Sequence, residues 1–144
     1  MRSVVAVLVV AVCGLSLAAC EDGPTSRCWF LEEPSLPDFS GRVAWADTTH
    51  VAARHLARII IDDVHYPRWG DVNPRFPDIP LPDTVVVHIT EKTARFIRQR
   101  DGSLWCTGSM LPVLADSVHV WHTGVELRSR PPQYFARRIE ICVP

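Results

Sequence analysis

The sequence predicts an all-β domain that follows a short N-terminal leader. Residues 111–143 contain two runs in which apolar and polar side chains alternate, as in Val118 and Val120, and a period of two is typical of strands with one buried face. The run 84–89 is rich in β-branched residues, which favour strands. Five prolines between 65 and 83 exclude regular structure in that stretch.

The same criteria, taken along the chain, predict five or six short strands. In order, these cover 41–45, 56–62, 84–89, 93–98, 118–123 and 135–142. In the first, we expect Val43 and Trp45 to share one face. The stretch 49–64 also has the spacing of a helix, but its β-branched residues favour a strand from Leu56 onward.

Two connections are long. The Pro-rich loop 65–83 is expected to be functional or mobile, as such loops in compact domains usually are. The connector 104–115 leads into the last two strands and has room for one helical turn. Short strands separated by turns predict a small barrel or sandwich, and a five-stranded, OB-like Greek-key barrel fits the strand count and the long connector.

The first 20 residues have the features of an export signal. One positive charge precedes an uncharged run of 16 residues, 4–19, which is shorter than the roughly 20 residues that a membrane-spanning helix needs. The run ends in Leu17-Ala18-Ala19-Cys20, which resembles the lipobox of bacterial lipoproteins. That resemblance implies cleavage before Cys20, lipid on its sulfur and an acylated N-terminus, and several acyl chains together give a firm anchor.

This interpretation divides the chain into a signal peptide (1–19), a lipidated cysteine with an extended, Pro-containing tether (20–38) and a β-barrel domain (39–144). The whole chain has 15 basic and 16 acidic side chains, a balance that gives no general attraction to nucleic acid or anionic lipid. Cys28, Cys106 and Cys142 remain in an oxidising compartment, so one disulfide and one thiol are expected.

The order of motifs from Val85 onward resembles the YobA-like family of small bacterial lipoprotein domains of unknown function. The resemblance rests on the opening Gly41-Arg42-Val43, on Val118-x-Val120-Trp121 with Gly124, and on Ser129-x-Pro131-x-Gln133-x-x-Ala136-x-x-Ile139. It covers roughly 41–62 and 84–142 and implies an OB-like fold, but no catalytic residue. The Pro-rich insertion 65–83 has no counterpart in the family pattern.

The implied barrel also suggests a disulfide. Its third and fifth strands run side by side in the same direction, which would bring Cys106 and Cys142 to one end. A bridge between Cys106 and Cys142 is therefore preferred, and one between Cys28 and Cys142 is the alternative; either would contribute roughly 2–4 kcal/mol.

Few residues suggest chemistry. Asp62, Asp63 and His65, with Asp71 and Asp78, could form a cation site, but the prolines break the regular spacing that such loops use. Cys106 with a distant histidine could act as a thiol nucleophile.

Two further groups of residues are considered and set aside. His119 and His122 are expected on opposite faces of a strand, which prevents them from binding one ion together. Trp121, Tyr134 and the arginines 128, 130, 137 and 138 would suit single-stranded nucleic acid, but Arg137 and Arg138 point to opposite faces.

The sequence therefore predicts a non-catalytic binding or structural module at the bacterial cell envelope, anchored to the inner or outer membrane through lipid on Cys20. An envelope protein or small ligand would bind through 65–83, and no cofactor, metal or nucleic acid is expected. The alternatives are a thiol- or metal-dependent envelope enzyme or accessory subunit, and a polyanion or nucleic-acid binder that uses the OB-like face.

Overall fold

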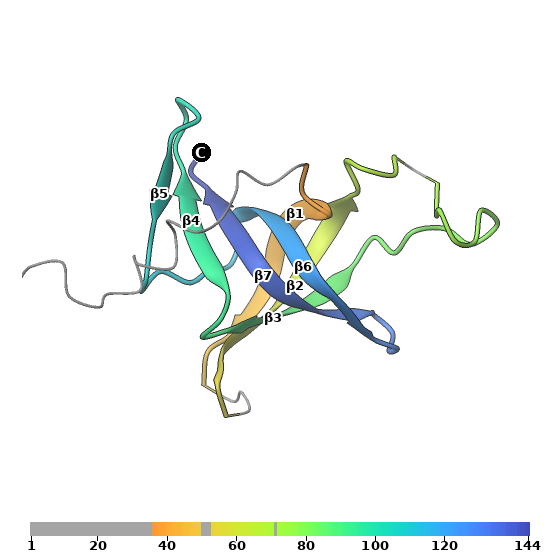
Figure 1. The fold of residues 1–144 in the computed structure, drawn as a ribbon, viewed down its shortest axis with the longest axis horizontal. Helices are drawn as coiled ribbons and strands as arrows, with labels where there is room; N and C mark the ends of the chain where they lie inside the picture. Colours follow the sequence, from red (N-terminus) through yellow and green to blue (C-terminus); the bar gives the residue numbers. More distant parts are fainter. Residues whose placement is uncertain (1–35, 50–52, 71) are drawn as a thin grey trace, which may run out of the picture.

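The computed structural model describes residues 36–49, 53–70 and 72–144, which form seven strands in one sheet (Figure 1). The prediction of an all-β domain is confirmed, and none of these residues lies in a helix. The strands are β1 (Phe39–Asp47), β2 (His55–His65), β3 (Val85–Thr90), β4 (Ala94–Arg98), β5 (Leu104–Cys106), β6 (Ser117–Leu127) and β7 (Gln133–Cys142).

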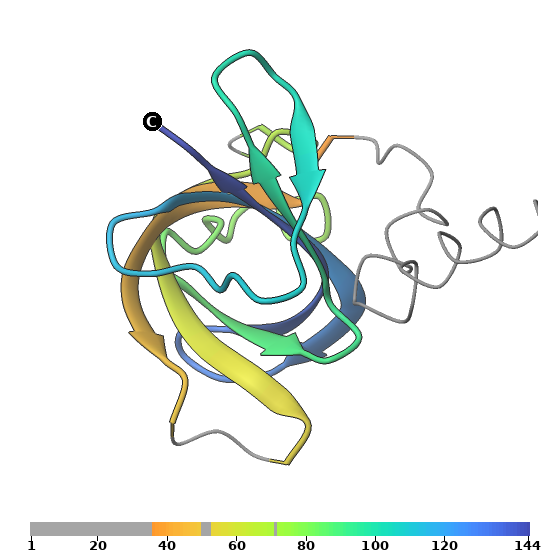
Figure 2. The same cartoon turned by 90° about the vertical axis from the view of Figure 1, so that its left-hand side faces the viewer.

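Five of the strands form a closed circuit of pairings. Antiparallel pairs join β3 to β2, β2 to β1, β1 to β6 and β6 to β7, and a parallel pair between β7 and β3 returns to the start. In Figure 2 these strands encircle the interior of the domain. The C-terminal strand pair predicted from 111–143 is thus present as β6 and β7. β7 pairs antiparallel with β6 and in parallel with β3, and the second pairing closes the circuit.

The predicted count of five strands is wrong, because β4 and β5 extend the sheet beyond the circuit. β4 pairs in parallel with β7, and β5 pairs antiparallel with β4 at the end of the sheet. The turn before β4 fixes this arrangement, since the Thr93 hydroxyl donates a hydrogen bond to the carbonyl of Ala136, 2.7 Å away. β5 has only three residues, too few to show a period of two, and it replaces the helical turn considered for the connector 104–115.

The hydrophobic core fills the circuit from all five of its strands. Along β1, β2, β3 and β6 its members alternate with residues that point outward, as predicted for β6. The alternation predicted for β7 is wrong in part: Ala136, not Phe135, joins Ile139 in the core, because a register shift interrupts the pairing of β7 with β6 between them. Each fully buried Val, Leu, Ile or Phe contributes roughly 1.5–3 kcal/mol. The residues of the core cluster on these five strands are Phe39, Val43, Ala57, Ile59, Ile61, Val85, Val87, Ile89, Val118, Val120, Ala136 and Ile139.

Two expectations for β1 and β2 need correction. A register shift between Val43 and Trp45 breaks the alternation: Val43 is buried, whereas Trp45 is 40% exposed and lies 5.4 Å from the Arg58 guanidinium. β2 was expected to end at Asp62 but continues to His65. Asp62 and Asp63 therefore both lie within the strand, and the Pro-rich loop begins at Tyr66.

A charged cluster lies on the outer face of β4, β6 and β7. Glu140 has no exposed surface, and its two carboxylate oxygens accept hydrogen bonds from Arg98 (2.8 Å) and Arg138 (2.6 Å and 3.1 Å). The Arg138 guanidinium lies 4.0 Å from the centre of the Phe96 ring and 5.1 Å from that of Trp121. Buried charges persist only where they are paired and hydrogen-bonded, and Glu140 meets that condition.

This cluster predicts a pH window of maximal stabilisation. Burial raises the pKa of Glu140, but hydrogen bonds from His119, Arg138 and Arg98 outweigh burial and lower that pKa from 4.5 to about 2. Hydrogen bonds to Cys142 and Glu140 raise the pKa of His119 from 6.5 to about 9. The stabilisation from Glu140 is therefore complete above 4.5 and lost as the pH falls towards 2, and that from His119 is complete below 6.5 and lost as the pH rises through 9.

We expect the cluster to contribute most between pH 4.5 and 6.5. Urea unfolding of the parent chain and of His119→Gln, repeated across pH, measures how much His119 contributes to the free energy of unfolding. The variant should be less stable than the parent chain near the middle of this window, and the difference should disappear above about pH 9. A difference that stays constant across that range would contradict the pairing.

In the part of the chain that the structure describes, no helix is long and apolar enough to cross a membrane. The predicted signal peptide, the lipidation site Cys20, Cys28 and most of the tether 20–38 lie outside the described residues.

Candidate functional site

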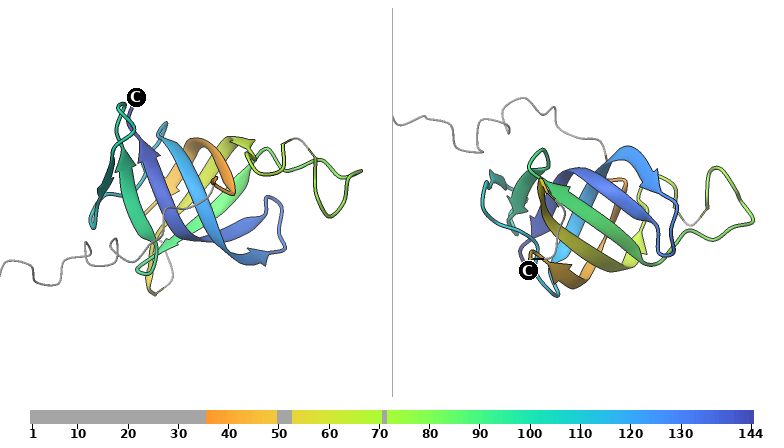
Figure 3. Two further views of the ribbon diagram at one scale, coloured as in Figure 1. Left: turned by 45° about the horizontal axis from the view of Figure 1, so that its top comes forward. Right: turned by 90° about the horizontal axis from the view of Figure 1, so that it is seen from below.

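The Pro-rich loop between β2 and β3 extends away from the sheet into solvent. It leaves the end of the sheet opposite the β4–β5 hairpin, and residues 74–80 are all exposed (Figure 3). Three of its apolar side chains have more than half of their surface exposed: Val72 (58%), Phe76 (59%) and Ile79 (54%). The loop therefore presents apolar groups to solvent.

The base of this loop is fixed to the domain by Tyr66. Its ring is 4% exposed and packs against Phe39 and Trp69, and its hydroxyl donates a 2.9 Å hydrogen bond to the carbonyl of Pro82 at the other end of the loop. Burial, followed by the charges of Tyr134 and acidic neighbours, raises the pKa of Tyr66. The two ends of the loop are thus held together by a neutral phenol.

Asp38, which immediately precedes β1, connects the Pro-rich loop to β6 through its carboxylate. One carboxylate oxygen accepts a hydrogen bond from Arg68 in the loop at 3.0 Å, and the other accepts one from the backbone N–H of His122 at 2.9 Å. The His122 ring stacks on Phe39, and burial lowers the pKa of His122. Its Nδ1 accepts a hydrogen bond from the Gly124 N–H, which requires that nitrogen to be unprotonated.

Local hydrogen bonds shape the tip of the loop. The Asn73 side-chain oxygen accepts from the N–H groups of Arg75 and Phe76, at 3.0 Å and 3.1 Å, and the Ile79 N–H donates to the Phe76 carbonyl at 2.9 Å. These turns, with prolines that restrict the backbone, reduce the number of conformations available to the exposed Phe76 and Ile79.

The β6–β7 hairpin adds apolar surface at the same end of the sheet. In Figures 1 and 3 its tip and the Pro-rich loop extend from that end, and Val125 and Leu127 near the tip are 53% and 43% exposed. The candidate functional site is this loop end, defined as Val72, Phe76, Ile79, Val125 and Leu127.

The residues considered for a cation site do not assemble. Asp62 accepts a hydrogen bond from the Thr84 hydroxyl at 3.0 Å, while Asp63 and His65 are exposed near the end of β2. Asp78 lies on the exposed loop, and Asp71 lies outside the described residues. Among the described residues, no group of three or more His, Cys, Asp or Glu side chains is placed to hold a metal ion.

The predicted disulfide between Cys106 and Cys142 is wrong, because Cys142 is a free cysteine. The alternative bridge between Cys28 and Cys142 fails for the same reason. Cys142 lies at the end of β7 opposite Ser117, whereas Cys106 pairs with Phe96 in the β4–β5 hairpin. The inferred approach of the two cysteines placed Cys106 just past a strand that runs beside the last one. Cys106 instead lies in a strand of its own, β5, which β4 separates from β7.

The two histidines of β6 do lie on opposite faces. His119 faces outward, with its Nδ1 3.6 Å from Glu140, and His122 packs against the core residue Phe39. Sequence reasoning missed the contact between His119 and Glu140, although their strands were predicted, because the pairing register was unknown.

The arginines and aromatic residues considered for nucleic acid do not form one surface. Arg138 is buried against Glu140, whereas Arg137, Arg128 and Arg130 are exposed. Tyr134 is half-buried and packs against Phe39.

Comparisons of the chain with family models, curated proteins and solved structures gave no match.

Proposed function

We propose that this chain is a lipid-anchored lipoprotein of the bacterial cell envelope whose domain binds another envelope protein without catalysis. The anchor is lipid on Cys20, by the resemblance of residues 17–20 to a lipobox. The binding surface is the loop end, and the observation that carries the proposal is its exposed apolar side chains on a loop with a fixed base.

The chemistry of the loop end favours a protein as the partner. Exposed apolar groups gathered at one place on a soluble domain are typical of interaction sites. An aromatic residue such as Phe76, held by local turns, can fill a pocket on a partner at a small cost in conformational entropy. The exposed charged residues next to these side chains in the sequence, Arg75, Asp78 and Glu126, are of mixed sign, which disfavours a polyanion as the ligand.

An OB-like barrel is the fold that we propose for this module. The closed circuit β1–β2–β3–β7–β6, with its single parallel pair between β3 and β7, supports it, and so does the core inside that circuit. In this description β4 and β5 are an addition to the five-stranded barrel, and the Pro-rich loop is its insertion between the second and third strands.

Site-specific photocrosslinking of the full chain in membranes of a bacterium that encodes it tests the proposal. A photoreactive phenylalanine analogue at position 76 or 125 should give an adduct with the same envelope protein. Replacing Ile79 by Ser should reduce the adduct formed from position 125 severalfold, because an apolar anchor of the shared surface is lost.

The matched control carries the same analogue at Lys92, which is exposed in the turn between β3 and β4. It should give no adduct with that protein. Equal adducts from positions 76 and 92, or none from position 76, would refute the proposed binding surface.

A further inference from the structure

We propose that Cys142, His119 and Glu140 form a reactive thiol site that takes up half of a small-molecule disulfide as a mixed disulfide. This site lies on β6 and β7, apart from the loop end, and does not depend on the binding function proposed above.

Strand register brings the three residues together. Ser117 pairs with Cys142 and His119 pairs with Glu140, so these four side chains belong to one face of the β6–β7 pair. The residues between them, Val118 and Ile141, are buried. Cys142 and His119 are both half-buried, so both side chains remain accessible from solvent.

Each residue has a distinct part in the site. The His119 side chain is the diagonal neighbour of Cys142 on this face, and its Nδ1 lies 3.6 Å from Glu140. Glu140 is held in place by Arg98 and Arg138 and can therefore orient the imidazole. A nucleophile beside a histidine that a third group orients is the usual arrangement of an activated cysteine.

The local charge also favours this chemistry. His119 holds its proton at neutral pH, because hydrogen bonds to Cys142 and Glu140 raise its pKa to about 9. An imidazolium and two arginines thus surround a single carboxylate. The thiolate is the form that attacks disulfides, and the protonated imidazole can supply a proton to the thiolate that departs.

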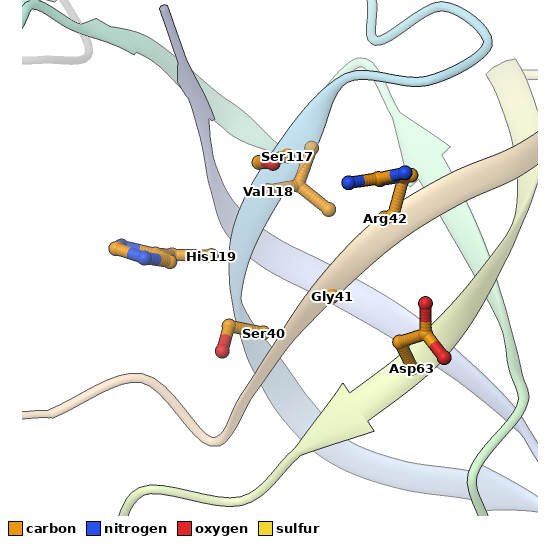
Figure 4. Close-up of a pocket in the computed structure, with 7 residues that line it drawn as sticks. All are labelled: Ser40, Gly41, Arg42, Asp63, Ser117, Val118 and His119. Atoms are coloured by element: carbon orange, nitrogen blue, oxygen red, sulfur yellow. The ribbon is translucent and has the colours of Figure 1, made fainter. Parts of the chain in front are cut away.

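A hollow beside His119, between β6 and β1, offers room for a ligand. Its volume is about 270 Å³, and its lining includes Ser117, the direct partner of Cys142, and His119. Figure 4 shows His119 and Ser40 at one side of the hollow and Arg42 and Asp63 at the other. A small disulfide with polar substituents fits this mixed lining.

The reaction is a thiol–disulfide exchange. The Cys142 sulfur, as thiolate, attacks one sulfur of the disulfide R–S–S–R, a new S–S bond forms, and the old one breaks. The second half leaves as R–S⁻ with the bonding electron pair and takes a proton from His119 or water. One disulfide is consumed and one is made, so no further oxidant is needed.

The test treats the full chain with dithiodipyridine, an uncharged aromatic disulfide, at neutral pH without reductant. Trypsin cleaves after Arg138, so mass spectrometry of Ile139–Pro144 follows Cys142 alone. We expect that peptide to carry the mixed disulfide, and His119→Gln to slow its formation about tenfold. His65→Gln, the same change at an exposed histidine, should leave the rate unaltered.

Measurement of the same peptide in urea keeps the test independent of whether His119→Gln folds. The folded parent chain should react faster than its unfolded form, because only the folded chain holds the imidazole beside the sulfur. An unmodified peptide in the folded chain, a folded rate below the unfolded one, or equal rates for folded His119→Gln and the parent chain would overturn the proposal.

Discussion

Glu140→Gln is expected to lower the free energy of unfolding by about 3–5 kcal/mol, the cost of removing one partner from a buried charge cluster. Glu140 is fully buried, and it is the anion that both Arg98 and Arg138 contact. The substitution keeps the shape of the side chain but removes its charge. Arg138, which is 5% exposed, would then remain charged in the protein interior with no carboxylate beside it.

Urea unfolding of the full chain at neutral pH measures this loss. Glu126→Gln is the matched control, because Glu126 is exposed near the tip of the β6–β7 hairpin and should change the stability by less than about 0.5 kcal/mol. Equal, small effects of the two substitutions would show that the buried cluster contributes no net stability. A loss confined to Glu140→Gln would assign the stabilisation to its ion pairs.

Local sequence patterns were sufficient to predict most of the sheet. Alternation along β6 and β7 and the β-branched run of β3 each depend on side chains that are close in sequence. The five prolines likewise predicted an irregular loop after β2. Each of these elements follows from the preferences of its own residues.

The errors concern pairing between distant segments. β5 is three residues long and exists because it pairs with β4, a contact that no local pattern encodes. The disulfide was misassigned for the same reason, since the position of Cys106 depends on β4 lying next to β7. The His119–Glu140 contact also requires the register of β6 on β7, which only the folded sheet defines.

The loop end was predicted in part. The composition of 65–83 indicated a functional or mobile loop, but it did not indicate that Phe76 and Ile79 are exposed while Tyr66 is buried. All three side chains are large and apolar or aromatic, so residue type alone does not predict which of them is buried. The distinction arises from the core residue Phe39, against which Tyr66 packs from a distant part of the chain.

Gly41→Ala is expected to cost about 3 kcal/mol of stability, at the upper end of the effect of inserting a methyl group into a packed interior. A Cβ atom at this position would lie 2.5 Å from the Ile61 Cγ2 and 2.6 Å from the backbone oxygen of Asp62. The side chain could adjust, but the oxygen belongs to β2, which pairs with β1 around this position. Relief would therefore require a shift of one strand against the other.

Gly70→Ala separates this steric cost from the general cost of replacing glycine. Gly70 has a φ of +59°, and a Cβ there would meet nothing within 4 Å, so its substitution should cost about 1 kcal/mol for the left-handed backbone alone. Enlarging the side chain to Val should increase the loss at Gly41 further, because the contact with the Asp62 oxygen becomes worse. If Gly41→Ala cost no more than Gly70→Ala in urea unfolding, the close approach of β1 to β2 could not be what requires glycine at position 41.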